Sequence, residues 1–459
     1  MLPDDTFVPG EFKIFDEIVV NALDQFTRTR EKQARGEDTA PVKTIKVDYD
    51  KETGEISVWN DGEGIPVELH EKEKIYIPEL IFGNLLTSSN YDQSEKKHVG
   101  GKNGYGAKLA NIFSSKFTIE TVDEKNKLKF TQTFRDNMKV KEKPKISKYG
   151  KKPYTQVSYI PDYARFKQKG LTDDMIKIIV KRAYDMAAWT DNSVSVFLNG
   201  EKIESKNFEK YVDLYIGAKS ETPRAYEKVN DRWEVCACLN PNVSFEQVSF
   251  VNGIQTYKGG KHVDTVLNSI AKRLAEIIQK KNKITVKPVF IKENIMLFIK
   301  ATIDNPSFNS QTKECLTTNA SQFGSKCEIS QKFIDQLAKC GIIERALQLS
   351  SVKDMTDMKK SDGKKRNRIT GIPKLDDANM AGTKESEKCT LILTEGDSAK
   401  ALALSGLSII GRNYYGVFPL KGKVLNVDDI KNLKKIMQNA EINNIIKIMG
   451  LETNKKYTS

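Results

Sequence analysis

This sequence contains few histidines and no long apolar run. Its 459 residues include three histidines, at positions 70, 98 and 262, so a site with several imidazole ligands or a Ser/His triad has little material to use. No run of about 18 apolar residues is present, which excludes a membrane-spanning helix. The opening MLPDDTFVPG lacks the basic and apolar segments of a secretion signal. We therefore expect no membrane partner.

Cysteine is also sparse and scattered. The six cysteines have one close pair, Cys236 and Cys238, whose side chains would point to opposite faces of a strand. This distribution argues against a disulfide framework or a zinc site. It favours reduced thiols in an intracellular compartment.

The bulk composition is that of a multidomain globular protein. The length predicts two to four domains, and the chain is 39% hydrophobic and 29% charged. The net charge of +13 favours a polyanionic partner such as nucleic acid.

Apolar spacing predicts a mixed α/β (α+β) chain. Residues 199–200, Asn-Gly, are a hairpin signal within the strand-like stretch 193–203. Helices are predicted over 11–28, 77–86, 171–190 and 263–281, and strands over 44–50, 55–61, 116–122, 127–134, 154–161, 232–239, 248–254 and 294–304. Residues 388–407 are predicted to form a strand, a sharp acidic turn and a helix.

A glycine-rich stretch, GGKNGYGAKLANIF at residues 100–113, leads into a helical pattern. It is not a Walker A loop, because Lys102 is followed by Asn103. It is not a dinucleotide fingerprint either, because Leu109 stands where the third glycine would be. Glycines let backbone N–H groups approach an anion, and the start of a helix offers free donors. We expect a phosphate cradle of another kind.

Two further signals precede this loop. Glu17 and Asn21 are four residues apart, so they share one helix face; the carboxylate suits a base and the amide oxygen a metal ligand. The alternative is a solvated face. Asp61-Gly62-Glu63-Gly64 follows a strand, where glycines admit a flat ring and a carboxylate can accept from an exocyclic amine. The alternative there is a simple turn.

The three signals in this order resemble the ATP-binding domain shared by gyrase-type topoisomerases, heat-shock chaperones, histidine kinases and mismatch-repair ATPases. Longer segments, among them KIFDEIVVNALD, LIFGNLLTSSNYD, SFNSQTKE and LILTEGDSAKALALSGL, resemble eukaryotic-type DNA topoisomerase II over nearly all of 7–451. The resemblance implies a GHKL/Bergerat-type ATPase sandwich at 1–216 and a ribosomal-S5-like transducer at 217–350. A basic connector at 351–387 and the incomplete beginning of a Rossmann-like Toprim domain at 388–459 would follow.

The resemblance also implies an ATP site. Glu17 would be the general base toward water, Asn21 would hold a magnesium ion on the triphosphate, and Asp61, where many members carry Asn, would contact the adenine side. Lys102 replaces an arginine common in the family, which preserves charge but loses the bidentate fork. The remaining expected ATP contacts are Ser88, Ser89 and Asn90 at ribose and phosphate, Gly101, Lys102, Asn103, Gly104, Tyr105, Gly106, Ala107 and Lys108 around the phosphates, and Gln311, Thr312 and Lys313 of a transducer loop. Gln311 and Lys313 would reach the terminal phosphate and take part in catalysis.

Two weaker sites follow from the same resemblance. Lys280, Lys281 and Asn282 would contact DNA, although a lysine run is usually just solvated. Glu395 ends an apolar strand and would bind the magnesium ion of a Toprim domain. The acids beyond 407, which are Asp428, Asp429, Glu441 and Glu452, do not form the D-x-D pattern that such a site also needs. We expect a fragment that carries the ATPase residues but lacks the DNA-attacking tyrosine.

The expected function is that of an ATP-operated DNA gate, a homodimer acting on double-stranded DNA with ATP and Mg²⁺. An ATPase clamp of the mismatch-repair or chaperone type is one alternative, and the E-G-D-S-A stretch argues against it. A DNA-binding module without turnover is the other, and the intact Glu17 and Lys313 argue against that. The expected location is the nucleus for a cellular protein, or the virion or host cell for a viral one.

Overall fold

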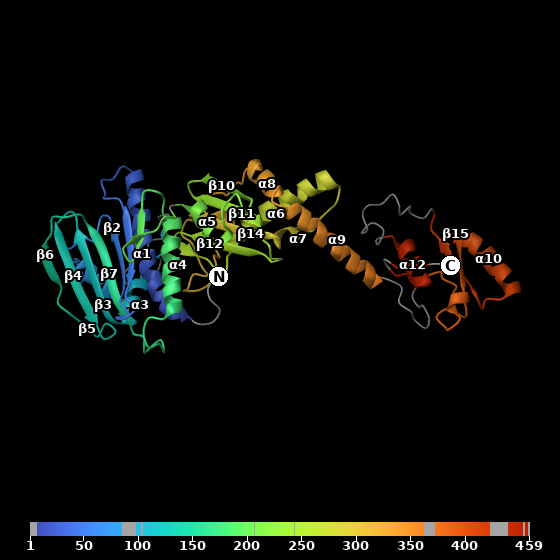
Figure 1. The fold of residues 1–459 in the computed structure, drawn as a ribbon, viewed down its shortest axis with the longest axis horizontal. Helices are drawn as coiled ribbons and strands as arrows, with labels where there is room; N and C mark the ends of the chain where they lie inside the picture. The colour runs from blue at the N-terminus through green and yellow to red at the C-terminus, as the bar shows by residue number, and fades with distance from the viewer. Residues whose placement is uncertain are drawn as a thin grey trace. The chain divides into compact units, whose positions relative to one another are not determined.

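The structure, a computed structural model, describes residues 7–84, 98–101, 104–205, 207–242, 244–361, 372–422, 439–452 and 455–457, with only the backbone over 352–361. It divides into two compact units (Figure 1). The first contains residues up to 274 together with 292–342, and the second contains 275–291 together with 343 onward. No described helix has the length and apolar character needed to cross a membrane.

The first unit begins with a large, mostly antiparallel sheet. Its strand order is β5-β4-β3-β7-β2-β1-β8-β9, with β6 paired to β4, and only the β1–β8 pair is parallel. The strands are β1 (Thr44–Tyr49), β2 (Ile56–Asp61), β3 (Ser114–Asp123), β4 (Leu128–Arg135), β5 (Val140–Lys141), β6 (Lys145–Lys148), β7 (Tyr154–Pro161), β8 (Ser195–Leu198) and β9 (Glu201–Lys202).

Helices cover one face of this sheet (Figure 1). They are α1 (Pro9–Ala34), α2 (Ile77–Gly83), α3 (Gly106–Ile112) and α4 (Asp173–Trp189), and α5 (Phe208–Ile216) packs against α4. Helix α1 starts at a proline, whose fixed φ suits a first helical position, and buries Phe15, Val19 and Leu23 in the core. These positions recur every four residues, so one stripe of α1 faces the sheet while the adjacent stripe remains for polar residues.

A second sheet follows in the same unit, in the order β10-β11-β14-β12-β13. Its strands are β10 (Arg224–Asn230), β11 (Trp233–Leu239), β12 (Glu246–Val251), β13 (Ile254–Gln255) and β14 (Ile295–Ala301), and the same unit contains η1 (Ala320–Gln322) and α8 (Gln331–Ala338). Helix α6 (Lys261–Asn282) belongs to this unit up to Leu274; its remainder and nearly all of α7 (Pro288–Lys292) belong to the second unit. Helix α5 joins the two layers, because Tyr211 and Tyr215 pack edge-on against Phe250 and Phe298 of the second sheet. Both sheets therefore share one continuous core.

Most sequence predictions of secondary structure are confirmed. The Asn199-Gly200 signal forms a two-residue hairpin, in which Leu198 pairs with Glu201 and both turn residues have positive φ. Helix α1 is longer than predicted at both ends, and α2 ends at Gly83 because Asn84 is extended. Helices α5 and α8 were not predicted; each is short and begins at a side-chain cap, Asn207 or Ser330.

The second unit contains α9 (Ile342–Ser361), η2 (Ser386–Lys388), β15 (Thr390–Glu395), α10 (Gly396–Ile410), β16 (Tyr415–Leu420) and α12 (Ala440–Met449). Strands β15 and β16 are parallel, with α10 as the crossover, and Glu395 pairs with Leu420 at the carboxyl end. The predicted strand, turn and helix over 388–407 are confirmed.

Candidate active site

A cavity of about 220 Å³ lies in the first unit between α1, the glycine-rich loop and the loop after β14. Its lining comes from α1, from strands β2 and β7 and helix α2 of the first layer, from the glycine-rich loop with the start of α3, and from the loop after β14. The lining residues are Glu17, Ile18, Asn21, Ala22, Asp24, Gln25 and Arg28 of α1; Val58, Asn60, Gly64, Ile65, Ile81 and Phe82; Gly101 and Gly104–Lys108; Thr155 and Val157; and Gln311 and Lys313. The expected ATP residues that the structure describes therefore meet in one place, apart from Asp61 and Thr312.

Helix α1 presents a polar stripe to this cavity. Glu17, Asn21, Asp24 and Arg28 follow one another at steps of four, three and four residues, which places them on one face. The stripe lies beside the apolar one that packs on the sheet. Sequence reasoning identified its first two members and missed Asp24 and Arg28, although the same spacing would have found them.

Asp24 holds the beginning of the glycine-rich loop. Its Oδ1 accepts a hydrogen bond from the backbone N–H of Gly100 at 2.7 Å, and its Oδ2 accepts one from Gly101 at 2.9 Å. Burial raises the pKa of Asp24, while Arg28 and these two N–H groups oppose the rise. The loop is thus fixed to α1 at its start.

Glu17 is a buried carboxylate between two lysines. Its Oε1 accepts a hydrogen bond from Lys313 Nζ at 2.9 Å and lies 2.8 Å from Lys13 Nζ, and its side chain is 7% exposed. Burial by itself raises the pKa of Glu17, but Lys313 and Lys13 outweigh it and hold the pKa below its usual value. Glu17 is therefore ionised at neutral pH and able to accept a proton.

Gly106, the first residue of α3, must be small. An added Cβ would lie 2.0 Å from Glu17 Oε2, so only a glycine lets α3 approach this carboxylate. Two residues on, Lys108 is almost fully buried and its Nζ donates to the carbonyl of Gly104 at 2.6 Å. Burial lowers the pKa of Lys108 to about 8. The glycine-rich loop thus carries its own cation next to the cavity.

The expected contact of Asp61 with the adenine side stays a prediction. The structure brings Asn60 into the cavity lining, while Asp61 Oδ1 accepts hydrogen bonds from the backbone N–H groups of Lys43 and Thr44 at 2.7 and 2.8 Å. The cause is the alternation of side chains along β2, which puts adjacent residues on opposite faces. Gly64 must be small for another reason than the predicted approach of a ring, because a Cβ there would lie 1.9 Å from the carbonyl oxygen of Val122.

The loop after β14 contributes Gln311 and Lys313 to the cavity. Thr312, between them, lies outside the lining; its hydroxyl pairs with the hydroxyl of Ser310 and donates to Glu314 Oε1. Five other expected ATP contacts lie outside the described residues: Ser88, Ser89, Asn90, Lys102 and Asn103.

A magnesium ion on a nucleotide would find one suitable protein ligand here. Asn21 is exposed to the cavity, and its amide oxygen is the hard ligand that Mg²⁺ prefers beside phosphate oxygens. Within the described ranges, no three or more His, Cys, Asp or Glu side chains gather as a metal site. The residues therefore fit an ion held chiefly by substrate phosphates.

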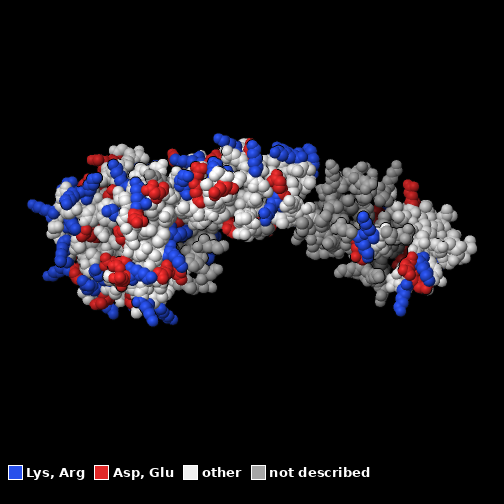
Figure 2. Space-filling view, viewed as in Figure 1, with Lys and Arg blue, Asp and Glu red and all other residues white. Residues whose placement is uncertain are grey.

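The two weaker sites are open surfaces. Lys280, Lys281 and Asn282 are exposed at the end of α6. Figure 2 shows basic side chains spread over the first unit with acidic ones between them, so in that view the net charge of +13 does not form one patch. Glu395 is exposed at the end of β15, where the following turn places Asp397 in an ion pair with Lys374.

Comparison with known proteins gives a consistent result. A family described as "Histidine kinase-, DNA gyrase B-, and HSP90-like ATPase" matches residues 11–138, and one described as "DNA gyrase B" matches 201–366. DNA topoisomerase 2 of Bombyx mori is 50% identical over 100% of this chain and 29% of its own length. DNA topoisomerase 2 of Drosophila melanogaster is 49% identical over 98% of this chain and 31% of its own length. The chain thus spans less than a third of these curated relatives.

Solved structures agree with these relatives. The ATPase region of Saccharomyces cerevisiae topoisomerase II is similar with a TM-score of 0.69 at 44% identity, covering 75% of this chain and 88% of that one. The ATPase and transducer domains of DNA topoisomerase II from Balamuthia mandrillaris are similar with a TM-score of 0.70 at 43% identity, covering 76% and 86%.

Proposed function

The chain belongs to the eukaryotic DNA topoisomerase II family, and we propose that it is the ATP-hydrolysing gate of an enzyme that passes one DNA duplex through a transient break in another. One observation carries the proposal. Glu17 from α1 and Lys313 from the loop after β14 meet in one cavity beside the glycine-rich loop. A carboxylate and a cation from two layers of the fold thus flank the space for a terminal phosphate.

In the proposed reaction the phosphates of ATP lie along the glycine-rich loop. Lys313 moves from Glu17 to the terminal phosphate. Negative charge builds up on the transferred phosphoryl group, and a cation there stabilises the transition state. Glu17, then freed of one lysine, accepts a proton from a water molecule as that water attacks the terminal phosphorus and ADP leaves. Gln311, two residues before Lys313 in the same loop, orients the same phosphate. A magnesium ion, when bound, supplies charge neutralisation between the phosphates, and Asn21 is the residue to hold it.

Lys313 also provides the route from hydrolysis to movement. Its loop follows β14 of the second sheet, while Glu17 belongs to the helix layer of the first. Loss of the terminal phosphate removes the anion that draws Lys313 away from Glu17, so nucleotide state decides the position of this loop. In a homodimer, two such chains would close when ATP binds and open after hydrolysis.

The partners in this proposal are double-stranded DNA and a second copy of the chain, in the nucleus of a eukaryotic cell. Lys280, Lys281 and Asn282 are the proposed DNA contacts, and Glu395 is the proposed magnesium ligand for DNA cleavage. Their exposure supports both assignments, since DNA and a shared ion must approach from outside.

The deciding experiment compares ATP turnover of the wild-type chain and the Glu17→Gln variant. We expect the variant to bind a non-hydrolysable ATP analogue as well as the wild type does, and its kcat to fall by about 10²–10⁴-fold, the usual contribution of a positioned base. Glu37→Gln, at an exposed acid just after α1, is the matched control and should keep wild-type turnover. Undiminished hydrolysis by Glu17→Gln would refute the assignment. For the longer protein, ATP-dependent relaxation of supercoiled plasmid tests the DNA step.

A further inference from the structure

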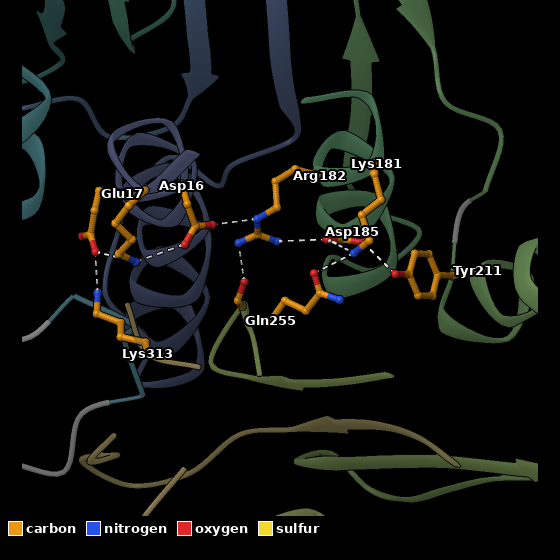
Figure 3. A network of polar contacts seen from close by, with 10 residues as sticks. Asp16, Glu17, Lys181, Arg182, Asp185, Tyr211, Gln255 and Lys313 are labelled. Atoms are coloured by element: carbon orange, nitrogen blue, oxygen red, sulfur yellow. Dashed lines mark hydrogen bonds and ion pairs between the residues drawn. The ribbon is translucent and has the colours of Figure 1, made fainter. Parts of the chain in front are cut away.

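A chain of buried charges continues from Glu17 away from the cavity (Figure 3). Its centre is Arg182 of α4, whose side chain is 1% exposed. The guanidinium donates from Nε to Asp16 Oδ1 at 2.8 Å and from one terminal nitrogen to the carbonyl of Gly253 at 2.7 Å. The other terminal nitrogen lies 3.9 Å from Asp185 Oδ2. Arg182 therefore joins α4, α1 and the turn between β12 and β13.

Asp16 connects Arg182 to the lysine that contacts Glu17. Its second oxygen, Oδ2, accepts a hydrogen bond from Lys13 Nζ at 3.2 Å, and the same Nζ lies 2.8 Å from Glu17 Oε1. Lys13 is thus shared between the two carboxylates. The contacts run in the order Arg182, Asp16, Lys13 and Glu17. Lys313 contacts the same Oε1 atom of Glu17 (Figure 3).

We propose that Arg182 and Asp16 are positioning residues for ATP hydrolysis: Arg182 fixes the Asp16 carboxylate, and Asp16 holds Lys13 against Glu17. This inference rests on the proposed function of Glu17. When Lys313 moves to the terminal phosphate, Lys13 is the cation that stays with the base. The orientation of Glu17 toward water then depends on a lysine whose own place is set by Asp16.

The burial of these groups explains why the arrangement is rigid. The Nε and one terminal nitrogen of Arg182 donate hydrogen bonds, and the planar guanidinium fixes these partners in direction as well as distance. The other terminal nitrogen has no hydrogen-bond partner among the described residues. Burial by itself raises the pKa of Asp16, but Arg182 and Lys13 outweigh it and lower the pKa to about 2. Asp16 therefore remains an anion throughout the neutral range and keeps its hold on Lys13.

Contacts with the second sheet anchor the other end. Lys181, next to Arg182 on α4, donates to Gln255 Oε1 of β13 at 2.7 Å and to both oxygens of Asp185 at 2.9 and 2.8 Å. Tyr211 of α5 donates to Asp185 at 2.6 Å. Because Gly253 and Gln255 belong to one hairpin, α4 is tied to the second sheet at two points. The position of Arg182, and with it that of Lys13, follows this hairpin.

The test uses three variants, Arg182→Met, Asp16→Asn and Lys13→Met, with kcat and KM for ATP measured against pH. None of these side chains lines the cavity, so we expect KM to change by less than about 3-fold and kcat to fall by about 10-fold or more, as for a small misplacement of a reacting group. Lys177→Met, at an exposed lysine of α4, is the matched control.

The pH profile separates positioning from simple stability. Lys13 and Lys313 face Glu17, while Arg182, Lys13, Lys313 and, farther away, Lys181 and Tyr257 surround Asp16. Removing a cation in Lys13→Met or Arg182→Met should move the acid limb of kcat to higher pH. Asp16→Asn, which releases Lys13 from its place against Glu17, should move the limb in the same direction, whereas loss of the negative charge alone would move it to lower pH. A purely structural role lowers thermal stability but leaves the acid limb in place.

The outcomes are distinguishable from failure of the proposed function. If Glu17→Gln abolishes turnover while folded Asp16→Asn and Lys13→Met keep the wild-type kcat and acid limb, the inference is overturned and the proposed function stands. If Glu17→Gln hydrolyses ATP normally, both fall. Should Arg182→Met fail to fold, Asp16→Asn and Lys13→Met decide, and Arg182→Lys, which retains the charge, should recover part of kcat.

Discussion

Two glutamates of this chain, Glu17 and Glu395, are proposed to serve chemistry, and their surroundings are opposite. Glu17 is buried on a helix between two lysines that come from separate parts of the first unit. Glu395 is exposed at the end of a two-stranded parallel sheet in the second unit. A buried carboxylate requires partners, because leaving it unpaired costs several kcal/mol. An exposed one is solvated and requires none.

The difference shows what each region can do alone. Around Glu17, the proposed base, the lysine proposed to contact the terminal phosphate and the anchored glycine-rich loop are already assembled. Around Glu395, the described residues include the Asp397–Lys374 ion pair but no metal-binding group of three or more acids. The site around Glu17 is preorganised by its own unit. A metal site at Glu395 would need ligands beyond the described residues around it.

Among tests of this difference between Glu17 and Glu395, the largest effect on activity is expected from Lys313→Met. The change removes the cation proposed to stabilise the transferred phosphate, so kcat for ATP should fall by about 10²–10³-fold. It also takes one lysine from Glu17, which should move the acid limb of kcat to higher pH. Steady-state kinetics across pH measure both. Lys258→Met, at an exposed lysine paired with Glu314 beside the same loop, is the control; wild-type turnover in Lys313→Met would remove the loop from catalysis.

Gly106→Ala should be next in size. The new Cβ would lie 2.0 Å from Glu17 Oε2, so either α3 or the carboxylate must move. We expect a loss of about 1–3 kcal/mol in the free energy of unfolding, as for overpacking a core, together with a fall in kcat. Urea unfolding measures the first. Gly406→Ala, in α10 of the second unit, adds a Cβ to open space and should be neutral or slightly stabilising. An equal change in the free energy of unfolding in both variants would contradict the close approach of α3 to Glu17.

A smaller, pH-dependent effect is expected at His98, just before the glycine-rich loop. Its ring contacts Glu31 of α1 and Asp304 after β14, and the bond to Glu31 raises the pKa of His98, against burial and with help from Asp304. A raised pKa means that the stabilisation is complete below the unfolded value of about 6.5 and is lost as pH rises through the folded value.

The check is the free energy of unfolding of His98→Gln relative to wild type. The variant should be less stable by about 1 kcal/mol or less at acid pH, the range of a partly exposed ion pair, and the difference should shrink toward pH 9 or so. A difference that grows with pH would show that the sign is wrong.

The smallest effect is expected from Glu395→Gln. Because Glu395 is exposed, the substitution should change the free energy of unfolding by less than about 0.5 kcal/mol and leave ATP turnover by this chain unaltered. Thermal unfolding and ATPase kinetics measure these two. A marked loss in either would mean that the two glutamates are less different than their surroundings indicate.

Local patterns were sufficient for much of the site. The four-residue spacing of Glu17 and Asn21 predicted a shared helix face, and the glycines around 100–106 predicted a loop over the same place. The hairpin at Asn199-Gly200 was equally local. Such features depend on residues close in sequence, whose geometry follows from helix and turn periodicity.

What the sequence did not show involves side-chain direction and distant partners. Asp61 and Asn60 are neighbours on a strand, and only the packed sheet decides which one faces the cavity. Asp24 shared the spacing of Glu17 but showed its role only through hydrogen bonds to Gly100 and Gly101. Nothing near Arg182 in the sequence indicates its link to Asp16, which is 166 positions away.

The sequence by itself determined which residues are candidates for chemistry and on which kinds of element they lie, because periodicity and backbone freedom are local properties. Only the tertiary structure decided which charges neutralise one another. The Lys313–Glu17 contact spans 296 positions, and its existence depends on two sheets sharing one core. Burial makes such a pairing necessary, and packing selects the partner.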